Sequence, residues 1–250
     1  MLSSCEFLIL TIWSPMKSKH HFPHAATVFF LLTVAVALFS WIGSIYGLEK
    51  VQSLLSPEGI RWELRHAVEN FVRTPALGIV MILFIGCGIA VRSGIMVTLG
   101  KVIKRGKQVS RKEKRALVLA SCLLFVYIIM IVCTTFAPWT ILRSVTGSLT
   151  NSPFQKGIYY LVSFGIGLLG VVFGYASGRF RDDKDIIKGM SCLFSRFADY
   201  FVILFFIVQF FSSLMYTNLI GWIGIDSYII LYAFYICCYL PFLWMLNRKK

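Results

Sequence analysis

The chain has 250 residues and a formal net charge of +14, yet only 14% of its residues are charged while 58% are hydrophobic. A soluble domain has about 25% charged residues, and a chain of this length keeps too much surface to hide so many apolar side chains. The composition disfavours a soluble enzyme, a disordered chain and a disulfide-bonded secreted scaffold. It also favours a membrane over nucleic acid as the partner of the basic residues.

Residues 1–24 are predicted to form a cytoplasmic tail. Residues 1–13 are apolar but too short to span a bilayer, and they lack the basic start and cleavage site of a signal peptide. Met16, followed by Lys-Ser-Lys-His-His, is a more natural start, so a mis-called start at residues 1–15 is left open.

The sequence predicts no metal or cofactor. His20 and His24 have the i, i+4 spacing of helical metal ligands, but Pro23 lies between them and no carboxylate is near. We interpret them, with His21, as part of a basic juxtamembrane tail. The seven cysteines include no CxxC pair, and their odd number indicates reduced thiols.

Six dense apolar runs are predicted to cross the bilayer, which takes about 20 residues per helix. They are residues 25–46, 75–91, 116–142, 157–178, 200–225 and 227–247. Because the runs do not alternate polar and apolar residues, a transmembrane β-barrel is excluded. The predicted fold class is an all-α polytopic membrane protein, with a single helical membrane domain at residues 25–247 and a basic tail at 248–250.

The basic residues orient these spans. Residues 101–115 hold eight Lys or Arg against the single acid Glu113, and residues 179–196 hold five more. Lys and Arg are concentrated in cytoplasmic loops of membrane proteins. We therefore expect both segments and both termini on the cytoplasmic side.

Between the first two spans, Ser56-Pro57-Glu58 is a helix-start pattern: a hydroxyl cap, a proline at the first helical position and an early acid. Residues 59–72 then place Ile60, Leu64, Val68 and Phe71 at helical spacing. This pattern predicts an amphipathic helix at the outer membrane interface, with an outer gate as the alternative.

Glycines and a few polar residues are the candidate functional positions within the spans. Gly170, Gly174 and Gly178, each four apart, predict a helix-packing face, with a hinge as the alternative. Polar groups inside apolar segments mark substrate pathways, which makes Arg92, Gln209 and Asn218 the pathway candidates. The alternatives are snorkelling for Arg92 and interhelical hydrogen bonds for the two amides, which lie about 180° apart on a continuous helix.

No catalytic set or P-loop accompanies these residues, so the sequence does not predict an enzyme. A six-span permease subunit served by a separate ATPase also fits the number of spans. It would need a cytoplasmic coupling helix, and residues 101–115 have no apolar stripe suited to one.

Several strings resemble the p-aminobenzoyl-glutamate transporter (AbgT) family. Residues 22–29, FPHAATVF, look like the family's PHPATLF, and residues 54–62, LLSPEGIRW, are similar to its NLLSPEGLRW. Residues 146–158, TGSLTNSPFQKGI, resemble TGSLLRSPFLKGI. Family members are longer, and their two re-entrant hairpins have no counterpart in the strings that carry the resemblance.

The resemblance implies a bacterial inner-membrane transporter of p-aminobenzoyl-glutamate or related aromatic amides and antimetabolites, coupled to a proton or sodium gradient. It carries over no substrate-binding residue, because the family's recognition positions lie in the segments without a counterpart. The alternative is a non-transporting scaffold, a partner subunit or a degenerate remnant. The expected partners are the lipid bilayer and either further copies of the chain or another membrane subunit, with no nucleic acid.

Overall fold

The computed structural model describes residues 24–48, 50–103, 110–136, 142–143 and 152–248, and the described part is helical throughout. The tail at residues 1–23, and with it the open question of the start, lies outside the described residues. The helices are α2 (Ala25–Ile45), α3 (Pro57–Val72), α4 (Pro75–Ser93), α5 (Ile95–Ile103), α6 (Arg111–Phe136), α7 (Pro153–Ala176), α8 (Asp183–Arg196), α9 (Ala198–Thr217), α10 (Leu219–Ile223) and α11 (Ser227–Arg248).

Six helical segments of the described chain are long and apolar enough to cross a membrane, which confirms the predicted fold class. Five correspond to single helices, namely α2, α6, α7, α9 and α11. The remaining segment, Pro57–Ser93, consists of α3 followed by α4. The predicted fifth run at 200–225 is divided, because α9 ends at Thr217 and the next residue, Asn218, adopts a left-handed conformation with φ 50°.

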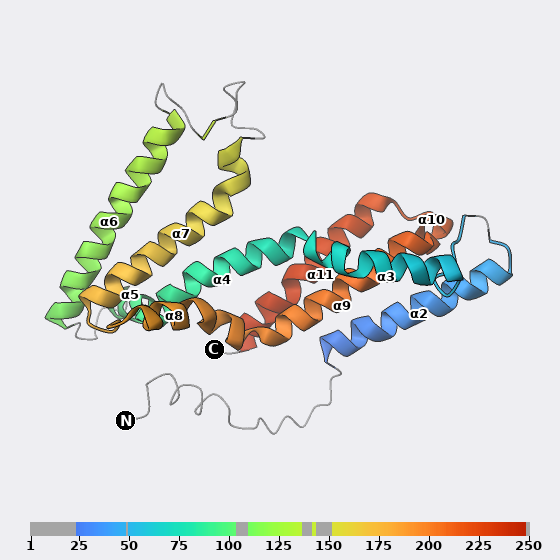
Figure 1. The fold of residues 1–250 in the computed structure, drawn as a ribbon, viewed down its shortest axis with the longest axis horizontal. Helices are drawn as coiled ribbons and strands as arrows, with labels where there is room; N and C mark the ends of the chain where they lie inside the picture. Colours follow the sequence, from blue (N-terminus) through green and yellow to red (C-terminus); the bar gives the residue numbers. More distant parts are fainter. Residues whose placement is uncertain (1–23, 49, 104–109, 137–141, 144–151, 249–250) are drawn as a thin grey trace.

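The helices form two groups that share α4. Figure 1 shows α6 and α7 side by side in one arm, while α2, α3, α9 and α11 lie together along the long axis of the molecule. One apolar core is built from α2, α4, α9 and α11 around Phe84, Tyr200 and Leu204. A second core joins α4 to α5, α6 and α7 around Ala90 and Phe173.

Small residues bring α4 and α7 into close contact. A Cβ on Gly170 would lie 2.8 Å from the backbone nitrogen of Ala90, and one on Gly167 would lie 3.5 Å from Cα of Gly86. The Ser163 hydroxyl then donates to the carbonyl of Ile82 and accepts from the N–H of Gly86. Close backbone approach at small residues is a common way for helices to associate in lipid.

The other predicted packing glycines have different surroundings. Gly174 faces the ring of Phe180, whose Cδ2 atom would lie 2.3 Å from an added Cβ. Gly178 lies beyond α7, has φ +77° and has no atom within 4 Å of an added Cβ. A left-handed turn, rather than helix packing, therefore explains the glycine at 178.

The start of α3 follows the predicted pattern. The Ser56 hydroxyl accepts from the N–H of Gly59 at 3.0 Å, and Pro57 occupies the first turn. The apolar stripe of this amphipathic helix, including Leu64 and Val68, is exposed and free to meet lipid. Phe71, at the end of the predicted stripe, and Trp62 pack against aromatic rings of α9, so α3 runs beside a span instead of lying apart from the bundle.

The close contact at Gly170 predicts a position-specific cost of added volume. Gly170→Ala should lower the free energy of unfolding by about 1–3 kcal/mol, because the new methyl group meets the backbone of Ala90. Gly157→Ala, on the same helix with no atom within 4 Å, should be neutral or stabilising by up to about 1 kcal/mol. Thermal unfolding in detergent compares the two, and equal destabilisation would contradict the packing role of Gly170.

Candidate functional site

The three predicted pathway residues do not meet in one place. Nη2 of Arg92, in the last turn of α4, lies 3.8 Å from Oδ1 of Asp185 in α8. Nε2 of Gln209 donates to the carbonyl of Ala67 at 2.9 Å, and Nδ2 of Asn218 donates to the carbonyl of Lys50 at 3.3 Å. Each side chain has a partner within the protein, and their roles in a substrate pathway stay predictions.

A helix break lies between α3 and α4. α3 ends at Val72 and α4 begins at Pro75, which has no N–H to continue the hydrogen-bond ladder. The buried Thr74 hydroxyl donates to the carbonyl of Asn70 at 2.7 Å and so satisfies one carbonyl at the end of α3. Broken helices with free backbone ends commonly form the binding sites of transporters.

A cavity of about 220 Å³ opens beside this break. It lies between the break, the C-terminal half of α9 and the first turns of α11. Its lining residues are Asn70, Arg73, Thr74, Pro75, Val208, Phe211, Ser212, Met215, Ile230, Leu231 and Phe234.

The lining of this break pocket combines aromatic, amide and cationic groups. The rings of Phe211 and Phe234 meet edge to face with centroids 5.4 Å apart. Nη2 of Arg73 lies 2.7 Å from Oε1 of Glu69, and its side chain is 78% exposed, so the guanidinium is accessible to a second anion. Aromatic walls, the Asn70 amide and an accessible guanidinium suit an aromatic ligand that carries a carboxylate.

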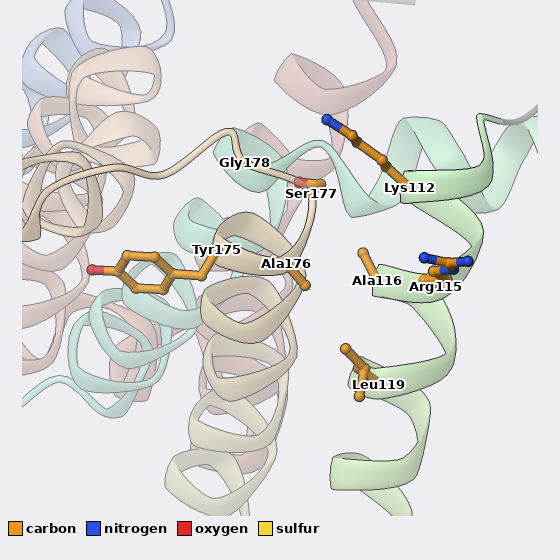
Figure 2. A pocket seen from close by; sticks show the side chains of 8 residues that line it. All are labelled: Lys112, Arg115, Ala116, Leu119, Tyr175, Ala176, Ser177 and Gly178. Atoms are coloured by element: carbon orange, nitrogen blue, oxygen red, sulfur yellow. The ribbon is translucent and has the colours of Figure 1, made fainter.

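A second, more open pocket of about 400 Å³ lies between the start of α6 and the end of α7. Figure 2 shows Lys112 extending from α6 toward the turn at Ser177 and Gly178, whereas the ring of Tyr175 points away from α6. The pocket contains none of the predicted pathway residues. Its exposed cations on the basic side match the setting in which membrane proteins meet anionic lipid headgroups.

Arg179, at the same end of the molecule, bonds to both α4 and α6. Its Nη1 donates to the carbonyl of Ser93 at 2.9 Å, and its Nη2 lies 2.9 Å from Oε1 of Glu113 in α6. Gly94 has φ +74°, a backbone conformation that favours glycine, and a Cβ there would displace the guanidinium of Arg179, whose Nη1 would lie 1.3 Å away. These contacts were not predicted from the sequence, although Gly94, three residues after the apolar run at residues 75–91, is a recognisable helix-end signal.

Asp185, the partner of Arg92, has a pKa below its ordinary value of 3.8. The main cause is the backbone N–H of Arg181, which donates to Oδ2 of Asp185 at 3.1 Å, and the charge of Arg92 adds to it. Both interactions favour the ionised carboxylate. Partial burial acts in the opposite direction but does not reverse the shift.

Comparison with known proteins identifies the family. The sequence model of the AbgT putative transporter family matches residues 17–105 and 100–246, which is most of the chain. The chain belongs to the AbgT family. Membership places this protein in a family of multi-pass membrane transporters, in agreement with its six candidate spans.

Two solved structures share the fold. Neisseria gonorrhoeae MtrF, described with a class of antimetabolite efflux pumps, superposes with a TM-score of 0.72 at 17% identity, over 85% of this chain and 72% of that chain. The Alcanivorax borkumensis YdaH transporter, described as having an unusual topology, gives a TM-score of 0.69 at 16% identity, over 84% of this chain and 76% of that chain. No curated protein matches the chain.

The lowered pKa of Asp185 predicts a pH-dependent contribution to stability. The contribution is fully present above the unfolded value of 3.8 and is lost as the pH falls through the lower folded value. Asp185→Asn should therefore unfold at a lower temperature than the parent at neutral pH, and the difference should shrink as the pH drops below 3.8.

Asp226→Asn is the control for this measurement, because residue 226 is exposed, precedes α11, and asparagine caps a helix as well as aspartate does. A gap between Asp185→Asn and the parent that persists unchanged at the acidic end would contradict the assignment of that stability to the ionised carboxylate of Asp185.

Proposed function

We propose that this AbgT-family chain transports an aromatic amide with a carboxylate, such as p-aminobenzoyl-glutamate or a related antimetabolite, across the bacterial inner membrane. A proton or sodium gradient would drive the movement. The observation that carries the proposal is the family match over most of the chain. The fold shared with MtrF and YdaH supports it.

The break pocket supports this class of substrate. An aromatic ring would pack against Phe211 and Phe234, and a carboxylate would pair with the guanidinium of Arg73. Asn70 would bond the amide that links the two. The three sequence-predicted pathway residues, Arg92, Gln209 and Asn218, lie outside the lining of this pocket and would act at other points of the pathway or in its support.

The proposed orientation places both termini and the basic helix ends in the cytoplasm. In Figure 1, α5, α8 and the first turn of α6 gather at one end of the molecule. These elements carry Lys101, Lys184, Lys188 and residues 111–115, a basic-rich set. Cytoplasmic placement of this end follows the distribution of positive charge in membrane proteins.

The alternative is a non-transporting scaffold or partner subunit that acts through association with further copies of the chain or with another membrane protein. What favours it is that Arg92, Gln209 and Asn218 all bond to other parts of the chain, as structural residues do. Mass measurement after mild solubilisation tests it. A stable complex in a chain that moves no substrate supports the scaffold, and an isolated monomer removes it.

Transport in proteoliposomes tests the main proposal. Labelled p-aminobenzoyl-glutamate should accumulate with the parent protein under an imposed proton or sodium gradient, and Arg73→Gln should weaken apparent affinity about tenfold or more through loss of a charged hydrogen bond. Arg65→Gln, an exposed arginine of the same helix that does not line the pocket, should leave transport unchanged.

Two outcomes would count against this account. Equal accumulation in vesicles with and without the protein would remove transport of this substrate. Equal loss in the Arg73→Gln and Arg65→Gln variants would keep transport but remove the break pocket as the place where the carboxylate binds.

A further inference from the structure

α3 and α9 run antiparallel along a shared face. Trp62 stacks on Tyr216 with ring centroids 4.3 Å apart, whereas Phe71 meets Phe205 with centroids 5.4 Å apart. Between these two aromatic contacts, Gln209 donates to the carbonyl of Ala67. Residue numbers therefore rise along α3 as they fall along α9.

In this register, Glu63 of α3 lies opposite Ser213 of α9. Glu63 lies one turn before Ala67 on α3, and Ser213 lies one turn after Gln209 on α9, so the four residues form two facing i, i+4 pairs. The Ser213 hydroxyl is close enough to act on the carboxyl of Glu63 as a hydrogen-bond donor. Glu63 is thus an acidic residue turned toward a membrane-spanning helix.

Three oxygen atoms at this contact are buried without a well-formed hydrogen bond. They are Oε2 of Glu63, Oε1 of Gln209 and Oγ of Ser213. Gln209 is only 5% exposed and Ser213 is fully buried. Although Ser213 lies beside Glu63, its hydroxyl is not aligned for a regular bond to Oε2. Buried polar atoms in native proteins nearly always have hydrogen-bond partners, so the lack of partners for these three oxygens needs an explanation.

No basic side chain in the described part of the chain forms an ion pair with Glu63. Arg61 and Arg65 lie about 160° from it around the helix axis and are exposed. The nearest titratable group on α3 is His66, whose Nδ1 is hydrogen-bonded to the carbonyl oxygen of Trp62. On α9, Tyr216 stacks on Trp62 and brings no positive charge.

An ionised Glu63 would therefore be a half-buried, unpaired charge facing an oxygen that can only accept. A carboxylate and an amide oxygen both accept hydrogen bonds, and the serine hydroxyl supplies a single proton for the set. One added proton on the carboxyl supplies the missing donor and removes the cost of burying the charge.

We infer that Glu63, Gln209 and Ser213 form a proton-binding site in which the Glu63 carboxyl is protonated at neutral pH and donates to Oε1 of Gln209. Glu63 precedes Ala67 on α3, whereas Arg73 follows it, and none of the three residues of the site lines the break pocket. It does not depend on transport, because occupancy by a proton is measured on the protein at rest.

Infrared spectroscopy of the full chain in lipid vesicles tests the inference. The parent at neutral pH should show a protonated-carboxyl C=O band that is missing in Glu63→Gln and retained in Glu69→Gln, which alters an exposed acid on the same helix. Ser213→Ala should keep the band but shift its frequency, since the hydroxyl beside the carboxyl is removed. If Glu63→Gln fails to fold, the frequency shift of the protonated-carboxyl band in Ser213→Ala tests the proposed site instead.

Two results would overturn the site. One is a spectrum in which Glu63→Gln and Ser213→Ala leave the protonated-carboxyl band of the parent unchanged. The other is loss of the Glu63 band when sodium chloride replaces choline chloride at constant pH, which would make sodium, not a proton, the resident cation. Either result leaves the transport assay with Arg73→Gln unaffected, so the two proposals fail separately.

Discussion

The solvent around the helices is the constraint on which the structure depends. Large apolar side chains point outward from the peripheral helices, as at Leu31 on α2, Phe125 on α6 and Ile236 on α11, each more than half exposed. Such surfaces are stable only in an apolar surrounding, and in lipid each backbone polar group must be bonded within the protein. Continuous helices meet that requirement, which explains why the described chain has helices and short turns.

Within this lipid-facing shell, polar side chains stabilise the fold by bonding to backbone. Ser163 joins α7 to two backbone groups of α4, Tyr127 donates to the carbonyl of Leu161, and Tyr200 donates to that of Cys238. Because the hydrophobic effect is weak between helices in lipid, close packing at small residues and such bonds hold the two groups together through α4. The Glu63 site differs, since three of its oxygens lack such partners.

The six spans, the cap at Ser56 and the family could be predicted, because apolar length, helix-start residues and motif strings are local properties of the sequence. The division of one element into α3 and α4, and the position of α3 along α9, could not. An amphipathic pattern at residues 59–72 is the same whether the exposed stripe faces an interface or the side of a bundle. Arg179 and Glu63 gain their neighbours from distant segments, and no local spacing indicates those contacts.

The native cysteines of α6 provide the most direct test of lipid solvation. Cys122 is exposed at the surface of the protein, yet the account places it against acyl chains. In inside-out membrane vesicles, whose cytoplasmic face is outward, a charged maleimide should leave Cys122 unlabelled while it labels Lys112→Cys, which lies at the basic end of the same helix. Peptide mass spectrometry locates the label. Rapid labelling of Cys122 before the membrane is dissolved would contradict the account.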